Sequence, residues 1–256
     1  VEDIANGAGF SVILCNTDES ESKEYSYVQV LLQKQVDGFL LVPAHGASRS
    51  VDLILKQRVP LVILDRSVNA AVDTVCSDSE GGAYELTRHL LALGHRRIAM
   101  LSGPRDVSTS VDRVAGYRRA LAEAGVPVNE RLIIYHAFTR EGGYAMTTQV
   151  MALMPPPTAL FAANNFIAIG AFGALREAGK RVPEDVALVG FDDLPPTFMT
   201  DPFLTVAAQR VYELAQEATG LLLRRLAGEA PPEPQAIVLP TDLIVRRSSE
   251  LRIGNG

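Results

Sequence analysis

Two adjacent carboxylates, Asp192 and Asp193, follow a short apolar stretch at residues 186–189, with only Gly190 and Phe191 in between. An uninterrupted apolar stretch of this length is typical of a strand that is buried on both faces of a parallel sheet. In open parallel sheets, ligands bind just beyond the carboxyl ends of the strands. The two carboxylates could therefore contact a ligand, or one of them could cap a turn, and their position alone favours neither.

Polar side chains also follow three other apolar stretches. These are Asp65 and Arg66 after residues 61–64, Asn164 and Asn165 after 159–163, and Asn16, Thr17 and Asp18 after 11–15. Carboxylates accept hydrogen bonds and amides both donate and accept them, so a ring of such groups matches the hydroxyls of a sugar or another polyol. Arg113, near the start of a predicted helix, could add a charged fork against ligand oxygens. Each residue alone could instead be a helix cap or a turn residue, but recurrence at four strand ends favours a shared binding crevice.

The sequence does not predict an enzyme, a metal site or a cofactor. The stretch Gly7-Ala8-Gly9 precedes the apolar residues 11–15, whereas a dinucleotide-binding loop would follow a strand. The chain has no phosphate-binding P-loop, no Gly-x-Ser-x-Gly turn, no Cys-x-x-Cys pair and no His-Glu-x-x-His helix. Paired carboxylates could act as acid and base, as in glycoside hydrolysis, but only analogy between folds would support that assignment.

The amino-acid composition narrows the classes of partner and the cellular compartment that we expect for the protein. The chain of 256 residues carries a net charge of -6, so it offers no basic face for nucleic acid. No segment approaches the roughly 18 apolar residues that span a bilayer, and the first residues do not resemble a signal peptide. We expect the Arg246-Arg247 pair at a solvated strand end, and Cys15 and Cys76 as buried reduced thiols, which favours the cytoplasm.

Short apolar stretches alternate with amphipathic ones along the whole chain. The predicted strands are residues 11–15, 39–42, 61–64, 98–101, 132–135, 159–163 and 186–189. Predicted helices begin near residues 78, 111, 164 and 211, and glycines suited to a left-handed C-cap end the first three at 94, 125 and 179. Repeated strand–helix units predict a doubly wound α/β fold with parallel strands, and the spacing leaves open whether one sheet or two are formed.

A series of short motifs extends over nearly the whole chain. They are residues 59–66, 93–99, 102–104, 113–117, 157–165, 168–170, 182–193, 204–205 with Gln209, and 243–246 with Ser248. In this order and spacing the motifs resemble the effector-binding core of the LacI/GalR (lactose/galactose repressor) family of transcriptional regulators.

The resemblance implies two doubly wound lobes like those of periplasmic binding proteins, with three crossings between them and a ligand in the cleft. One lobe would comprise residues 1–77 and 209–238, and the other residues 78–208 and 239–256. Family cleft positions fall on Asp65, Arg113, Asn164, Asp192 and Gln209. Phe138 falls where the family often places an aromatic ring against the ligand, although at this position alone a core role would be the simpler interpretation.

The chain departs from the family pattern at three places. Asn165 stands where the family usually has aspartate, and Val206 where it often has threonine, which leaves the ligand open. By the same resemblance, the chain would open within the helix that follows the family's first strand, and one sheet would lack a central strand. Family members carry a helix-turn-helix head of about sixty residues before that strand, and its recognition helix enters the major groove.

The function implied is that of a ligand-responsive bacterial transcriptional regulator. The chain would be its effector-binding and dimerisation domain, would bind a small polar effector such as a sugar or polyol, and would act on operator DNA through the head. The alternative is a periplasmic sugar-binding receptor of a transport system, which would have a signal peptide in place of the head. The sequence leaves open whether the effector acts as an inducer or a corepressor. It also leaves open whether the regulator responds to a purine or to a protein partner.

Overall fold

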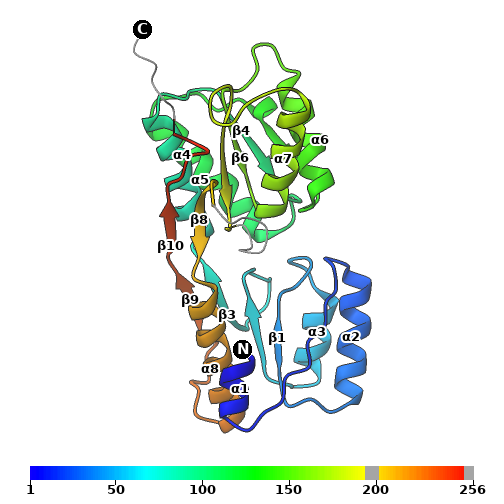
Figure 1. Cartoon of the computed structure of the whole chain (residues 1–256). Helices are drawn as coiled ribbons and strands as arrows, with labels where there is room; N and C mark the ends of the chain where they lie inside the picture. The colour runs from blue at the N-terminus through cyan, green and yellow to red at the C-terminus, as the bar shows by residue number, and fades with distance from the viewer. Residues whose placement is uncertain (194–201, 251–256) are drawn as a thin grey trace. The chain divides into compact units, whose positions relative to one another are not determined.

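The computed structural model describes residues 1–193 and 202–250, and the chain divides into two compact units (Figure 1). The first unit comprises Val1–Ser77, Asp106–Ser108 and Arg210–Leu239. The second unit comprises Asp78–Arg105, Thr109–Gln209 and Pro240–Gly256. Both are α/β units built on a mostly parallel sheet, so the predicted doubly wound α/β class is confirmed.

The first unit contains a parallel sheet with strand order β1-β2-β3-β9. Its strands are β1 (Phe39–Leu41), β2 (Leu61–Leu64), β3 (Asp73–Ser77) and β9 (Ala236–Leu239), and its helices are α1 (Glu2–Gly7), α2 (Glu21–Gln33), α3 (Arg49–Lys56) and α8 (Val211–Ala227). Val62 packs in a cluster with α8, whereas the adjacent Ile63 packs in a cluster with α2 and α3. Because successive strand residues point to opposite faces, α8 covers one face and α2 with α3 covers the other (Figure 1).

The second unit contains a six-stranded sheet with order β10-β8-β7-β6-β4-β5, in which only β10 is antiparallel. Its strands are β4 (Ile98–Ser102), β5 (Ile133–Tyr135), β6 (Ala159–Ala162), β7 (Ala187–Phe191), β8 (Thr205–Gln209) and β10 (Thr241–Ile244). Its helices are α4 (Ser79–Ala92), α5 (Ser108–Glu123), α6 (Arg140–Met151) and α7 (Asn165–Glu177), and Glu130–Leu132 forms a 3-10 turn before β5.

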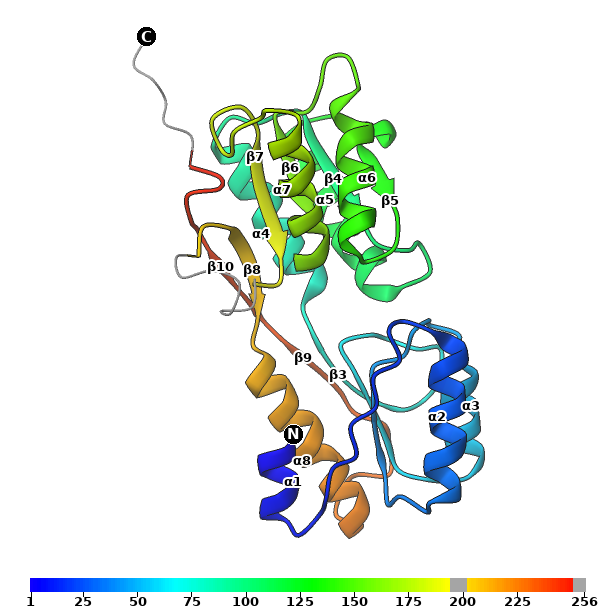
Figure 2. The same ribbon diagram turned by 45° about the vertical axis from the view of Figure 1, so that its right-hand side comes forward.

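Helices cover both faces of this second sheet. The fully buried ring of Phe191 lies against Gly82 of α4, whereas the neighbouring Gly190 faces Ala168 of α7. Figure 2 shows α7 packed along β7 and β6. The result is a three-layer unit whose central strands are buried on both faces, as their uninterrupted apolar sequences predicted.

One predicted strand is wrong. Residues 11–15 are extended but pair with no strand in the described chain, and Ile13 and Leu14 are 61% and 91% exposed. An uninterrupted apolar stretch predicts a buried strand, but a strand forms only where a neighbour supplies hydrogen bonds. The other six predicted strands are confirmed within two residues at either end.

The buried Asp73 and the partly exposed Arg225 form an ion pair that joins the start of β3 to the end of α8. Two guanidinium nitrogens donate to the Asp73 carboxylate at 2.6 and 2.8 Å, and the Gln235 amide donates at 2.7 Å. Burial alone would raise the pKa of Asp73, but these hydrogen bonds hold the pKa below its ordinary value of 3.8. The pair therefore contributes stability at neutral pH, and this contribution disappears as the pH falls below about 4.

We expect Asp73→Asn to lower the free energy of unfolding by about 3 kcal/mol at pH 7, because it leaves Arg225 without its anion. Urea unfolding of wild type and variant should show a difference that shrinks as the pH is lowered toward 3. Asp18→Asn, which breaks the exposed Lys23–Asp18 pair of the same unit, is the matched control and should change little. A difference for Asp73→Asn that is constant with pH would contradict this assignment.

Candidate functional site

The polar residues predicted for the second unit lie at one edge of its sheet. β4, β6, β7 and β8 are parallel, so their carboxyl ends meet at the same edge. Asn164 follows β6, Asp192 follows β7, and Gln209 ends β8. Arg113 reaches the same edge from α5, the helix that follows β4.

Arg113 is at the centre of the candidate site. Its side chain is 3% exposed, and one Nη donates to the backbone oxygen of Ala163 at 2.6 Å. The guanidinium carbon lies 3.7 Å from the centroid of the Phe191 ring, which is within cation–π range. Its Nε has no hydrogen-bond partner within the described ranges. A buried guanidinium that retains an unused donor is well suited to bind a ligand oxygen.

Asp192 joins Arg113 to Gln209. Its Oδ2 lies 4.0 Å from an Nη of Arg113, and its Oδ1 accepts a hydrogen bond from Gln209 Nε2 at 2.6 Å. The Asp192 backbone is left-handed, with φ of 66°, and its amide donates to the carbonyl of Ala207 on β8 at 3.0 Å. A carboxylate, an amide and a guanidinium thus converge at the tips of two adjacent strands.

Asn164 and Phe138 combine structural roles with positions at this edge. The Asn164 Oδ1 accepts from the amide of Ile167 at 2.9 Å, so it caps α7, as the alternative interpretation of its position predicted. This cap uses the side-chain oxygen and leaves Nδ2 as the group able to donate to a ligand. Phe138 packs partly against the core, and a Cβ on Gly103 would overlap its ring. Gly103 therefore permits the ring to lie directly on the backbone after β4.

Asp65 lies in the first unit, immediately after β2. Its backbone is also left-handed, with φ of 63°, and its amide donates to the carbonyl of Val75 at 3.0 Å. The contacts that join Arg113, Asp192 and Gln209 all lie within the second unit. The assignment of Asp65 to the same ligand therefore stays a prediction, as does the role of each of the other five residues.

The sequence did not reveal the role of Arg246. Its guanidinium donates to both carboxylate oxygens of Asp193, at 2.7 and 2.6 Å, and to the carbonyl of Leu204 at 2.9 Å. The expectation of a solvated strand end is therefore wrong for this residue. The hydrogen bonds from Arg246 to the Asp193 carboxylate raise the pKa of Arg246 above its ordinary value. The only sequence signal was the inclusion of Arg246 in the last of the family motifs.

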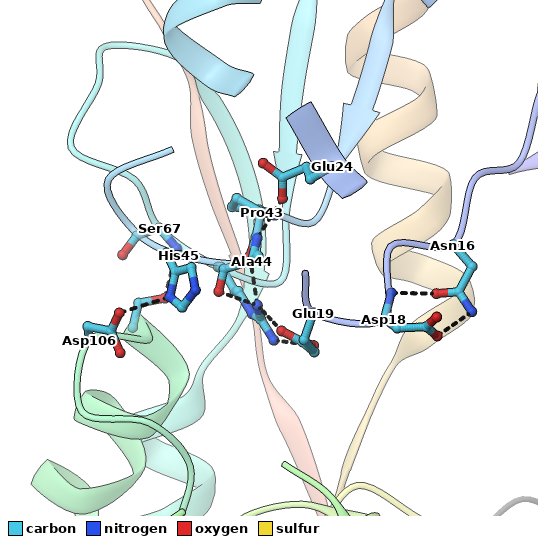
Figure 3. Close-up of polar contacts among 11 residues, drawn as sticks. Asn16, Asp18, Glu19, Glu24, Pro43, Ala44, His45, Ser67 and Asp106 are labelled. Carbon is cyan, nitrogen blue, oxygen red and sulfur yellow. Dashed lines mark hydrogen bonds and ion pairs between the residues drawn. The ribbon is translucent and has the colours of Figure 1, made fainter. Parts of the chain in front are cut away.

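A second polar group that the sequence did not reveal surrounds the loop after β1. The carboxylate of Glu24 is almost fully buried and accepts from the Ala44 amide at 2.7 Å (Figure 3). It also accepts from the Ser48 hydroxyl at 2.8 Å. Figure 3 also shows His45 paired with Asp106, at 2.8 Å. An acidic residue on an amphipathic helix is usually solvated, so no local pattern predicts that Glu24 lies inside the first unit.

Residues 1–193 and 202–250 contain no group of three or more His, Cys, Asp or Glu side chains placed to hold a metal ion. No helix in those ranges is long and apolar enough to cross a membrane. The contacts described above make the candidate site a set of hydrogen-bonding groups around the buried Arg113 guanidinium.

Comparison with known proteins identifies similar sequences and folds. The model of the periplasmic binding protein-like domain family matches residues 87–249. The HTH-type transcriptional repressor PurR of Haemophilus influenzae (strain PittEE) is 33% identical over 251 residues, which cover 97% of this chain and 75% of that protein.

Two solved structures with sugars in their descriptions are also similar. The transcriptional regulator CelR–cellobiose complex is 34% identical with a TM-score of 0.86, and the match covers 95% of this chain and 75% of that chain. A LacI family transcriptional regulator from Enterococcus faecium with bound ribose is 31% identical with a TM-score of 0.83, over 97% of this chain and 90% of that one. Matches of this length extend over both units of the chain.

Proposed function

Because this chain belongs to the LacI/GalR family of transcriptional regulators, we propose that it is the effector-binding part of such a regulator and that its effector is a sugar or a similar polyol. The observation that carries the proposal is the contact set of Arg113, Asp192 and Gln209 at one sheet edge. The similar proteins named above are transcriptional regulators, and two of the similar structures hold cellobiose or ribose.

The side chains of Arg113, Asp192 and Gln209 can form hydrogen bonds with adjacent hydroxyls of a ligand. A carboxylate accepts from two hydroxyls, while the guanidinium and the amides of Asn164 and Gln209 donate to hydroxyl oxygens. Phe138 offers an apolar surface of the kind that packs against the C–H face of a sugar ring. In this proposal Asp65 adds a second carboxylate, on the basis of its family position.

The effector would change the affinity of the regulator for operator DNA. It can do so only through different affinities for two conformational states, and coupling of about 1–3 kcal/mol is typical. The proposal includes a homodimer whose helix-turn-helix heads bind the operator. Such a regulator would act in the cytoplasm, where its DNA target lies.

Titration calorimetry tests the effector class. Ribose, cellobiose, other common sugars and a set of nucleobases are titrated separately into the protein. We expect saturable binding by at least one sugar and by none of the nucleobases. Binding of a nucleobase alone would overturn the sugar assignment, and turnover of a bound sugar would overturn the assignment as a regulator.

A further inference from the structure

The two candidate anchor carboxylates are held in the same unusual way. Asp65 follows β2 and Asp192 follows β7, and both have a left-handed backbone, with φ of 63° and 66°. Each amide donates at 3.0 Å to the adjacent strand, Asp65 to Val75 of β3 and Asp192 to Ala207 of β8. Residues other than glycine seldom adopt positive φ, so surrounding contacts must hold these two in place.

In the second unit, the contacts come from the residue that follows Asp192. The Asp193 carboxylate is bound at both oxygens by Arg246, and the Asp193 carbonyl accepts from Asn165 Nδ2 at 3.2 Å. Arg246 is itself fixed, because its amide donates to the hydroxyl of Thr205 at 2.8 Å. An aspartate at position 165 could not donate this hydrogen bond, so the departure from the family pattern has a structural role here.

In the first unit, the contacts again come from the following residue. Arg66 is 6% exposed, and its guanidinium donates to both oxygens of Glu19 at 2.7 Å. It also donates to the carbonyls of Pro43 at 2.7 Å and Ala44 at 3.0 Å, which lie near Glu19 in Figure 3. The Arg66 amide donates to the carbonyl of Leu64 at 2.7 Å, which closes a tight three-residue turn around Asp65.

The two arrangements share geometry and differ in charge. The residue after the anchor is a cation in the first unit and an anion in the second, so attraction of one kind of ligand charge cannot explain both. What they share is a two-point ion pair that ties the turn to a distant segment of the chain. This tie opposes relaxation of the turn toward the more favourable right-handed or extended backbone.

We propose that the Arg66–Glu19 and Asp193–Arg246 ion pairs are positioning devices that hold the left-handed turns at Asp65 and Asp192. The conformational part of this proposal is independent of any ligand. The second part, that the Asp65 and Asp192 carboxylates contact an effector, rests on the proposed function.

Hydrogen exchange at single amides, measured by NMR without ligand, tests the conformational part. Arg246→Met should speed exchange of the Asp192 amide by about tenfold or more and leave the Asp65 amide unchanged. Arg66→Met should give the reverse pattern. Arg246→Lys, which keeps a charge but loses the two-point geometry, should fall between Arg246→Met and wild type.

The controls separate a local effect from general loosening. The Ala187 amide, which donates to the carbonyl of Thr158 in the second unit, is the internal reference. Arg88→Met breaks the exposed Arg88–Glu85 pair and should leave all three amides as in wild type. Unchanged exchange at Asp192 in Arg246→Met, or equal acceleration at Asp192 and Ala187, would overturn the proposal.

Binding of the sugar identified in the titrations tests the remaining part. Arg246→Met should weaken that binding by about tenfold or more with unchanged stoichiometry, because the turn must be ordered at the moment of binding. If wild type binds no sugar, the proposed function fails while the exchange result stands. If the exchange changes and sugar affinity does not, the positioning of a ligand anchor is refuted.

Discussion

Arg113→Met should weaken binding of the effector by about 100-fold or more, which corresponds to ~3 kcal/mol. The guanidinium is buried, has an unused Nε donor, and lies 4.0 Å from the Asp192 carboxylate. Its loss removes a charged hydrogen-bond donor and leaves the Asp192 carboxylate beside an apolar side chain. Methionine retains most of the apolar volume against Phe191, so the fold should persist. Calorimetric titration with the sugar that wild type binds measures the change.

Arg118→Met is the matched control for that experiment. Arg118 lies on the same helix, α5, but its side chain is exposed and pairs with Glu130. This variant should bind the sugar with wild-type affinity. If Arg113→Met is folded and binds as tightly as wild type, the binding site lies elsewhere on the protein.

Gly170→Ala should destabilise the second unit by about 3 kcal/mol or more, because helix α7 has no room for a methyl group at this position. A Cβ on Gly170 would overlap the backbone oxygen of Arg140 on α6 and lie 2.7 Å from the amide nitrogen of Tyr144. Gly143 of α6 likewise lies against the backbone of α7, since a Cβ on Gly143 would lie 2.7 Å from the Cα of Ile167. Backbone atoms cannot rotate away, so the two helices would have to separate. Urea unfolding compares the variant with wild type.

The same helix supplies the control, at Gly173. Nothing lies within 4 Å of a Cβ built at this residue, and the glycine sits inside the helix. Gly173→Ala should therefore stabilise the protein by roughly 0.5–1 kcal/mol, the ordinary gain of alanine over glycine in a helix. Equal unfolding midpoints for the two variants would show that α6 and α7 do not pack closely through Gly170.

Among the described residues, the sequence predicted the edge strands β1 and β5 together with β2, β4, β6 and β7, and it missed β3, β8, β9 and β10. β2, β6 and β7 are uninterrupted apolar stretches, because both of their faces are covered by helices. Of the missed strands, β10 (Thr-Asp-Leu-Ile) mixes polar and apolar residues, whereas β9 (Ala-Ile-Val-Leu) is apolar although it is partly exposed. Residues 11–15 show the opposite error, since their pattern resembles a strand but no neighbour pairs with them.

For the candidate site, local sequence indicated positions but not partners. Asp192 and Asn164 were recognisable because strand ends are marked by where apolar residues stop. Arg246 was not, because its partner Asp193 is 53 residues away in the sequence and only the fold brings them together. The cap at Asn164 shows that a structural role and a site position need not be alternatives for the same side chain.

The order in which the chain is synthesised has a consequence for the first unit. β3 must pair with β9, and the face of Val62 and Val75 must be covered by α8, yet both partners come after the main body of the second unit in the sequence. During translation, the N-terminal sheet therefore has an unpaired edge and an uncovered apolar face until α8 and β9 have been synthesised. Such exposed intermediates are those that aggregate or recruit chaperones. The first unit is thus completed only after most of the second unit has been translated, and β10 then completes the sheet of the second unit.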